Sequence, residues 1–288
     1  MSFKVNLISH IQDISSKYPC ILSDIWGVIH NGVEPYKQMG EMLASYRRKG
    51  GIVILVSNAP RPWQSVVTQL QAIGVCPDIY DAIATSGDLA AKEVEKRYDQ
   101  KVYYIGVMTE NLPFKLSDVA QISIEEADYI YCTGPYNDET DTAENYREVL
   151  EKALARNVPF ICANPDLVVE RGNEIVLCAG SIAQAYEEMG GEVFWAGKPY
   201  VPIYELARQW AGEVGKKNIH KDGMVAIGDA IRTDIQGAKN FGIDSILVTT
   251  GIHNDVFSNL LKHDDPASAY AWLEQQKAQP TYLLPVSG

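Results

Sequence analysis

The strongest constraint on the fold of this chain is an alternation of short apolar runs with segments of helical periodicity. Runs such as Cys20–Leu22, Ile52–Val56 and Met224–Ile227 are each followed by a turn and then by an amphipathic stretch. Short, wholly apolar runs predict strands that are buried on both faces, which is typical of parallel sheets. Since parallel neighbours must be joined by a crossover, the alternation predicts right-handed βαβ units and an α/β fold with helices on both faces of the sheet.

Composition excludes several classes of protein. The chain has 288 residues, 46% of them hydrophobic and 22% charged, as in ordinary globular proteins. A formal net charge of −12 argues against non-specific binding to nucleic acid or to anionic membranes, which requires basic surface. The N-terminal segment 1–18 has an amphipathic helix pattern that is too polar for a signal peptide, and no apolar run approaches the roughly 18 residues of a membrane span. We therefore expect a cytoplasmic protein.

The five cysteines include no CxxC pair, and most of them lie in apolar runs. Reduced thiols in the core are the expected state, rather than disulfides or a zinc site.

The middle third of the chain repeats the alternation and predicts a second α/β unit over 87–180, inserted into a first unit made of 1–86 and 181–288. Small residues at both junctions could absorb a hinge rotation. In the last third, the strand 193–195 is assigned to the first unit. The sequence Thr233–Gln236 reads as a capping box that opens a helix ending at Gly242.

Polar residues follow four strands of the first unit: Asp24, Ser57-Asn58, Lys198 and Gly228-Asp229. The carboxyl ends of parallel strands open on one edge of a sheet, so these side chains are expected to lie close together. Two carboxylates and a turn carbonyl suit Mg²⁺, a lysine with a Ser/Asn pair suits a phosphoryl group, and an aspartate can act as a nucleophile. Each element alone is common, because a strand-end aspartate often only caps a turn.

The segments DIWGVIHNG, VSNAP, AGKP and GDAIRTDIQGA resemble the four motifs of the haloacid dehalogenase superfamily of phosphohydrolases. More narrowly, the chain resembles class IIA, whose α/β cap is inserted between the second and third motifs, and the resemblance covers nearly the whole chain. It implies a Rossmann-like catalytic core over 1–86 and 181–288 and a cap over 87–180 that selects the substrate. Phosphatases of p-nitrophenyl phosphate, nucleotides, pyridoxal phosphate and phosphoglycolate belong to that class.

The resemblance implies that four residues surround a Mg²⁺ ion, one of them also catalytic. Asp24 would be the nucleophile, forming an aspartyl-phosphate, and also a metal ligand. The main-chain oxygen of Trp26 and the carboxylate of Asp229 would be further ligands. Asp234 would support the ion, either by binding it directly or through the other ligands.

Five further positions would hold the substrate. The resemblance implies that Ser57 and Asn58 bind the transferring phosphoryl group, and that Lys198 neutralises charge on the phosphate and on the nucleophile. Asn164 and Asp166 would face the active site from the cap and help to select the substrate.

The chain departs from the family pattern at Trp26, where phosphatases of this family carry a second aspartate that protonates the leaving group. Loss of such a group typically costs about 10²–10⁴ in rate. The protein would then use substrates with good leaving groups, or draw the proton from His30 or Asp166, or catalyse a different step, or bind its ligand with little turnover. Trp26 itself would be either a hydrophobic plug or a wall that stacks on a flat substrate. Arg61 is a candidate to meet an anionic group of the substrate.

The sequence thus predicts a Mg²⁺-dependent phosphatase of small phosphorylated metabolites. The alternative is a catalytically weak or silent protein that binds or senses such metabolites, because Trp26 replaces the acid–base residue. A non-phosphatase reaction at Asp24 is disfavoured, since it would not need Lys198, Asp229 and Asp234. The expected partner is a small phosphorylated metabolite, with no nucleic acid and no membrane, and a homodimer is a further possibility.

Overall fold

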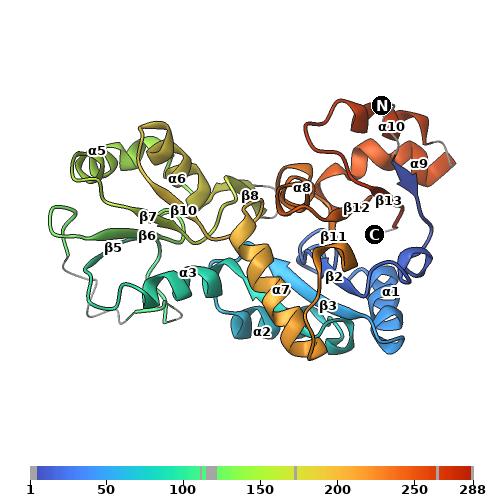
Figure 1. Ribbon diagram of the computed structural model, residues 1–288. Coiled ribbons are helices and arrows are strands. Elements are labelled where there is room, and N and C mark those ends of the chain that lie inside the picture. Colours follow the sequence, from blue (N-terminus) through green and yellow to red (C-terminus); the bar gives the residue numbers. More distant parts are fainter. Residues whose placement is uncertain (1–4, 111, 115–121, 172–173, 264–265, 287–288) are drawn as a thin grey trace. The chain divides into compact units, whose positions relative to one another are not determined.

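The computed structural model describes residues 5–110, 112–114, 122–171, 174–263 and 266–286 (Figure 1). The chain divides into two compact units. The first contains Met1–Ser57, Gln64–Ala84 and Lys198–Gly288, and the second contains Asn58–Trp63 and Thr85–Gly197. The boundary predicted after residue 180 is therefore wrong, because the second unit continues to Gly197 and also takes in the short segment after Ser57.

The described part of the first unit is built on a seven-stranded sheet of order β1-β13-β12-β11-β2-β3-β4. The pairs β1/β13, β12/β13, β11/β12, β2/β11 and β2/β3 are all parallel, as the apolar runs predict. The strands are β1 (Asn6–Leu7), β2 (Cys20–Ser23), β3 (Ile52–Ser57), β4 (Ala82–Thr85), β11 (Met224–Gly228), β12 (Asp244–Val248) and β13 (Tyr282–Leu284).

Helices cover both faces of this parallel sheet, which confirms the predicted Rossmann-like α/β core (Figure 1). In α1, the buried residues Met39, Met42, Leu43 and Tyr46 recur at the spacing of one helix face. Burying this stripe against the sheet is what holds an amphipathic helix in place. The helices described in or beginning at this unit are α1 (Lys37–Arg48), α2 (Trp63–Ile73), α7 (Val201–Gly215), α8 (Gln236–Phe241), α9 (Ser258–His263) and α10 (Ala267–Glu274).

The second unit has a parallel sheet of order β10-β7-β6-β5 and a separate antiparallel pair, β8 and β9. Its elements are α3 (Ser86–Glu95), β5 (Val102–Ile105), β6 (Tyr129–Cys132), α5 (Arg147–Ala155), β7 (Phe160–Cys162), β8 (Val168–Arg171), β9 (Glu174–Leu177), α6 (Ala179–Glu188) and β10 (Val193–Trp195). Tyr104, Tyr129 and Tyr131 are buried among the strands and pack in one apolar cluster. These three tyrosines therefore serve the core of the second unit.

Strand β10 corrects the sequence-based assignment of 193–195 to the first unit. It pairs in parallel with β7, with Val193 opposite Phe160 and Trp195 opposite Cys162. The chain leaves β7, passes through the β8–β9 hairpin and α6, and returns to the same sheet. A three-residue apolar strand can fit the edge of either sheet, so its sequence alone does not say which sheet it joins.

Two local predictions also fail. The N-terminal segment forms β1 and a 3₁₀ turn (Ile11–Ile14) instead of an amphipathic helix, although Ile8, Ile11 and Ile14 are buried. The predicted capping box at Thr233 is wrong, because the helical backbone begins earlier, in a π-helical turn η5 (Ile231–Ile235), and continues into α8. The end of that helix at Gly242 is confirmed, with φ of +81°.

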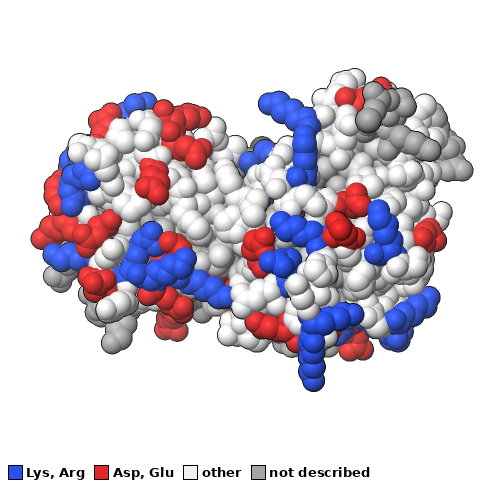
Figure 2. Space-filling model, in the orientation of Figure 1, with Lys and Arg blue, Asp and Glu red and all other residues white. Residues whose placement is uncertain are grey.

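Four of the five cysteines are buried free thiols, as expected, whereas Cys76 is exposed. Over the described residues, no helix combines the length and the apolar character needed to cross a bilayer. On the face drawn in Figure 2, positive and negative side chains are interspersed.

Candidate active site

Two neighbouring strands bring two aspartates to one edge of the first sheet. Asp24 follows the last residue of β2, and Asp229 follows the last residue of β11. The strands run in parallel with Ser23 opposite Ile227, and the N–H of Asp24 donates to the carbonyl of Ile227 over 2.8 Å. The carboxyl ends of β2 and β11 therefore present both carboxylates side by side, as predicted.

A third carboxylate and a lysine complete the cluster. Asp24, Asp229 and Asp234 each offer a carboxylate oxygen, and these three atoms lie within 4.8 Å of one another. The Nζ atom of Lys198 lies 2.5 Å from Oδ1 of Asp24 and 2.7 Å from Oδ1 of Asp234. All four side chains are almost wholly buried, and Asp24 is the most accessible, at 12%. We call this group the acidic cluster.

The two oxygens of Asp24 have different surroundings. The N–H of Ile25 donates to Oδ1 over 2.7 Å, and the ammonium group of Lys198 contacts the same oxygen. No donor from the described residues reaches Oδ2. One oxygen is thus held in place while the other is left for an incoming group.

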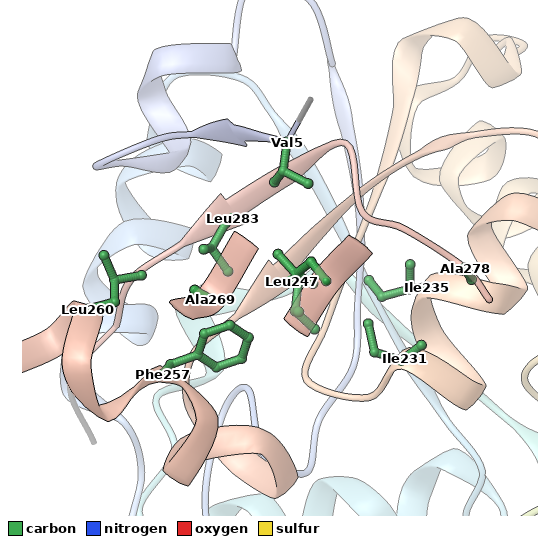
Figure 3. Packing of buried hydrophobic residues seen from close by; sticks show 10 residues of the cluster. Val5, Ile231, Ile235, Leu247, Phe257, Leu260, Ala269, Ala278 and Leu283 are labelled. Atoms are coloured by element: carbon green, nitrogen blue, oxygen red, sulfur yellow. The ribbon is translucent and has the colours of Figure 1, made fainter. Parts of the chain in front are cut away.

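Asp234 is fixed by its place in η5. Its Oδ2 accepts the N–H of Ala230 over 3.2 Å. On either side of it, Ile231 and Ile235 are buried in a cluster with Leu247 and other residues (Figure 3). The apolar neighbours anchor the turn in the core, so the carboxylate is presented by a rigid element.

Asp229 is held by close backbone contacts that the sequence analysis missed. The N–H of Ile252 donates to its Oδ2 over 3.0 Å. A Cβ atom on Gly27 would lie 2.2 Å from Oδ2 of Asp229, and one on Gly251 would lie 1.9 Å from it. Both glycines have positive φ, at +78° and +76°. The glycine directly after the Asp24 turn was the only sequence signal for this close approach.

The electrostatics of the cluster show mutual repulsion. Three carboxylates face one lysine, which gives a net charge of −2 when all four groups are ionised. Burial, followed by repulsion from Asp234, holds the pKa of Asp24 well above its usual range. The same two causes raise the pKa of Asp229 to about 7. For Lys198, burial favours the neutral form, but attraction to Asp234 and Asp24 outweighs it and the pKa is raised.

This donor set fits Mg²⁺. All three ligand atoms are carboxylate oxygens, which hard divalent cations prefer, and their close approach stores repulsion that a cation would relieve. Asp24, Asp229 and Asp234 would hold the ion. The proposed fourth ligand, the main-chain oxygen of Trp26, stays a prediction.

Trp26 lies on the turn after Asp24 with 48% of its surface exposed, so it is not a buried plug. Its ring and that of His30 meet edge to face, with centroids 5.3 Å apart. His30 is buried, its Nδ1 accepts the N–H of Gly32, and burial lowers its pKa. Its predicted role as a proton donor is not tested by these contacts.

The predicted phosphate- and substrate-binding residues lie mostly in the second unit. Asn58 donates through Nδ2 to Oδ1 of Asp166 over 3.0 Å, and the N–H of Asp166 donates to Oδ1 of Asn164 over 3.1 Å. The structure thus brings these three predicted residues together. Arg61 belongs to the same unit, where its main chain packs against Gly87. Ser57 is the last residue of β3, in the first sheet.

Lys198 reaches the acidic cluster by a different route from the one predicted. It was expected at the end of a strand in the first sheet, but the strand before it, β10, belongs to the second sheet. Lys198 is the first residue of the segment Lys198–Gly288, which belongs to the first unit. The prediction of its neighbours is confirmed even though the prediction of its strand is wrong.

The fold and the site together define an α/β protein with a buried acidic centre at the carboxyl edge of its parallel sheet, and comparison with known proteins names the family. Residues 21–116 match a model described as haloacid dehalogenase-like hydrolase, and residues 195–285 match one described as HAD-hydrolase-like. A crystal structure of a haloacid dehalogenase-like hydrolase from Brucella suis is 36% identical and covers 96% of this chain and 100% of its own, with a TM-score of 0.79.

Two further relatives have narrower names. The ribonucleotide monophosphatase NagD of Escherichia coli is 25% identical over 245 residues, which is 81% of this chain and 88% of that protein. A 4-nitrophenylphosphatase from Thermotoga maritima is 25% identical and covers 94% of this chain and 95% of its own, with a TM-score of 0.69.

The chain belongs to the haloacid dehalogenase-like hydrolases, and within them to class IIA. The resemblance seen in the sequence is confirmed.

Proposed function

We propose that the protein is a Mg²⁺-dependent phosphatase of small phosphorylated metabolites that works through an aspartyl-phosphate on Asp24. One observation carries the proposal. Lys198 and the N–H of Ile25 hold Oδ1 of Asp24 in place, whereas no donor from the described residues reaches Oδ2. Asp24 is also one of the three carboxylates of the acidic cluster. A fixed carboxylate with one open oxygen is what an attacking nucleophile requires. The phosphatases among the relatives support a phosphoric monoester hydrolase as the class of enzyme.

The residues suggest how each step proceeds. Oδ2 of Asp24 attacks the phosphorus atom of the ester, and the bond from phosphorus to the leaving oxygen breaks. Lys198 carries a positive charge at neutral pH. Before the attack this charge stabilises the ionised carboxylate of Asp24, and during the attack it stabilises the phosphoryl oxygens as negative charge develops on them. Water then attacks the phosphorus of the aspartyl-phosphate, which releases inorganic phosphate and restores Asp24. A bound Mg²⁺ would supply positive charge beside the phosphoryl oxygens.

The second unit is proposed as the cap that selects the substrate. Asn58, Asn164 and Asp166 form a connected polar group there, and Arg61 is carried on the same unit. These residues are proposed to meet the part of the metabolite that distinguishes one phosphate ester from another. A cytoplasmic location and a homodimer stay predictions from the sequence.

A second candidate function rests on Trp26. An indole cannot give a proton to a leaving group or take one from water, so turnover at this site would be slow for ordinary esters. A protein with the acidic cluster intact and little turnover would act by binding phosphorylated metabolites. The same assay separates the two functions.

The test is phosphate release from 4-nitrophenyl phosphate and from a panel of phosphorylated metabolites, with Mg²⁺ and again with EDTA. We expect native protein to release phosphate from at least one compound only with the metal present, and Asp24→Asn to release none. Asp244→Asn, a change at the opposite edge of the same sheet, is the matched control and should retain activity. Tight binding of a metabolite without steady-state release would favour the binding protein instead.

A further inference from the structure

We propose that Thr250 is a positioning residue of the active site, whose hydroxyl group closes a backbone clamp around the carboxylate of Asp229 and thereby raises the affinity for Mg²⁺. The inference rests on the proposed function, because Asp229 is a ligand of the proposed ion. It comes from one buried hydrogen bond between two segments that are 223 residues apart in the sequence.

The hydrogen bond of Thr250 crosses the carboxyl end of strand β11. In the first sheet β11 lies between β12 and β2, and Asp229 follows its last residue (Figure 1). Thr250 lies two residues after the end of β12, and Gly27 lies in the turn after β2. The hydroxyl of Thr250 donates to the carbonyl of Gly27 over 2.6 Å, and both residues are buried. The bond therefore joins the segments that follow the two neighbours of β11.

These two segments hold the carboxylate of Asp229 between them. Gly27 and Gly251 both lie against its Oδ2, from which an added Cβ would be only 2.2 and 1.9 Å away. The N–H of Ile252 donates to the same oxygen over 3.0 Å. Because Gly251 directly follows Thr250, the bond from Thr250 to Gly27 fixes the distance between the two glycines. We call Gly27, Thr250, Gly251 and Ile252 the Asp229 clamp.

The same bond helps to orient the main chain around the proposed fourth ligand. The main-chain oxygen of Trp26 shares a peptide group with the N–H of Gly27, which donates to the carbonyl of His30 over 2.9 Å. A trans peptide is planar and its N–H and C=O point in opposite directions, so this bond fixes the direction of the Trp26 oxygen. The next peptide carries the carbonyl of Gly27, which Thr250 fixes. Both peptides around Gly27 are thus held in place.

Precise placement of Asp229 matters because Mg²⁺ requires near-ideal octahedral geometry, with ligands at about 2.0–2.1 Å. The three carboxylate oxygens of the acidic cluster lie within 4.8 Å of one another and repel each other, so an unrestrained Asp229 would turn away from its neighbours. The Asp229 clamp prevents this rotation before an ion arrives, so binding does not have to order the side chain. Groups that orient metal ligands in this way typically change metal affinity about 10–100-fold.

The neighbouring threonine provides a matched control. Thr249 is also buried, and its hydroxyl donates to the carbonyl of Val286 over 3.0 Å and accepts the N–H of Val286 over 2.8 Å. Val286 follows β13, which lies on the opposite side of β12 from β11. Two adjacent threonines with buried, hydrogen-bonded hydroxyls therefore reach to opposite sides of β12, and Thr250 is the one that reaches the Asp229 clamp.

The first experiment titrates metal-free protein with Mg²⁺ in a calorimeter, without substrate. Thr250→Val removes the hydroxyl but keeps the branched shape, and should raise the Kd for Mg²⁺ about 10-fold or more. Thr250→Ala removes the hydroxyl without adding bulk and should give the same loss, whereas Thr250→Ser keeps the hydroxyl and should bind close to the native value. Thr249→Val should leave the Kd unchanged, although it should lower the midpoint of thermal unfolding at least as far as Thr250→Val does.

The second experiment measures phosphate release from 4-nitrophenyl phosphate at increasing concentrations of Mg²⁺. Thr250→Val should need about 10-fold more Mg²⁺ to reach half of its maximal rate. At saturating Mg²⁺ its kcat should stay close to the native value, because Asp24 and Lys198 are unchanged. Thr249→Val should keep the native dependence on Mg²⁺. A general loss of stability would not separate the two variants in this way.

The outcomes distinguish this inference from the proposed function. An unchanged Kd in Thr250→Val, an equal loss in Thr249→Val, or a Thr250→Ser variant as weak as Thr250→Val would overturn the inference, as would native protein that binds no Mg²⁺. Phosphate release by native protein, together with an unchanged Kd in Thr250→Val, would leave the proposed function standing without it. Binding of Mg²⁺ that depends on Thr250, in a protein that releases no phosphate, would mean that the proposed function fails while the role of Thr250 stands.

Discussion

The two edges of the first sheet bring together the same kinds of side chain with opposite results. At the carboxyl edge lies the acidic cluster. At the amino edge Asp244, the first residue of β12, accepts hydrogen bonds from Lys17, Tyr18 and Thr281 over 2.9, 2.5 and 2.8 Å. We call this second group the amino-edge network. Each edge thus contains a carboxylate and a lysine in ion-pair contact.

The directions of the pKa shifts distinguish the edges. At the amino edge burial opposes ionisation of Asp244, but the hydrogen bonds from Tyr18 and Lys17 outweigh it and the pKa is lowered. At the carboxyl edge the pKa values of Asp24 and Asp229 are raised by burial and by neighbouring carboxylates. A carboxylate supplied with donors stabilises the fold, whereas carboxylates crowded together store repulsion. Raised pKa values caused by burial and crowded carboxylates are expected at sites that catalyse a reaction.

The largest effect should follow from Asp24→Asn. We expect phosphate release to fall by at least about 10⁴-fold, because the nucleophile is lost. Without metal, the midpoint of thermal unfolding should rise, since the variant removes one carboxylate from a buried group whose carboxylates repel one another. Calorimetry in EDTA measures this. A fall in the midpoint would show that the carboxyl edge is not under the repulsion inferred here.

The two lysines offer a direct comparison between the edges. Lys198→Met leaves three buried carboxylates without their cation and should cost about 3–5 kcal/mol in the free energy of unfolding. Lys17→Met removes a pairing in which the lysine is 57% exposed and should cost less than about 1 kcal/mol. Urea unfolding of both variants in EDTA gives the two values. Similar costs would contradict the distinction.

Magnesium should stabilise the protein through the carboxyl edge alone. At a concentration 100 times Kd, the ion should add about 2.7 kcal/mol to the free energy of unfolding. Asp229→Asn should reduce this gain to under about 1 kcal/mol, as for a Kd raised about 25-fold. Asp244→Asn should retain the full gain. A thermal-shift titration checks all three proteins, and an equal gain in Asp229→Asn would remove that residue from the proposed ligands.

The smallest effect concerns pH at the amino edge. Because the pKa of Asp244 is lowered on folding, its contribution to stability is fully present above the unfolded value of about 3.9 and is lost as pH falls through the folded value. Native protein should therefore exceed Asp244→Asn in stability by a constant amount between pH 7 and 5, and the difference should shrink below about pH 4. Urea unfolding at pH 7, 5 and 3.5 measures it. A difference that persists at pH 3.5 and below would point to packing instead.

The acidic cluster could be predicted from the sequence because it depends on local signals and one rule of topology. Apolar runs predicted β2 and β11, and the carboxyl ends of parallel strands open on one edge of a sheet, so Asp24 and Asp229 were expected at the same edge. That β2 and β11 are direct neighbours is a finding of the structure. Lys198 was placed correctly for a partly wrong reason, since three apolar residues do not reveal which sheet β10 joins. That choice is made by tertiary packing, which the local sequence does not encode.

The setting of Trp26 could not be predicted for a similar reason. Whether the indole is buried or exposed depends on the positive φ of Gly32 and on the burial of His30, four residues away. The π-helical turn η5 could likewise not be predicted, because a threonine at 233 followed by a glutamine at 236 fits a capping box equally well. Side-chain exposure in a turn is decided by contacts that no periodicity describes.

Because Gly27 and Gly251 lie against the carboxylate of Asp229, mutations at these two glycines also disturb the acidic cluster. Neither glycine has a functional group, yet any side chain at either position would collide with that carboxylate. In a library of single substitutions scored for activity, both positions should therefore tolerate as little as Asp229 itself. The heritable information that specifies this candidate site therefore resides partly in residues that have no side chain.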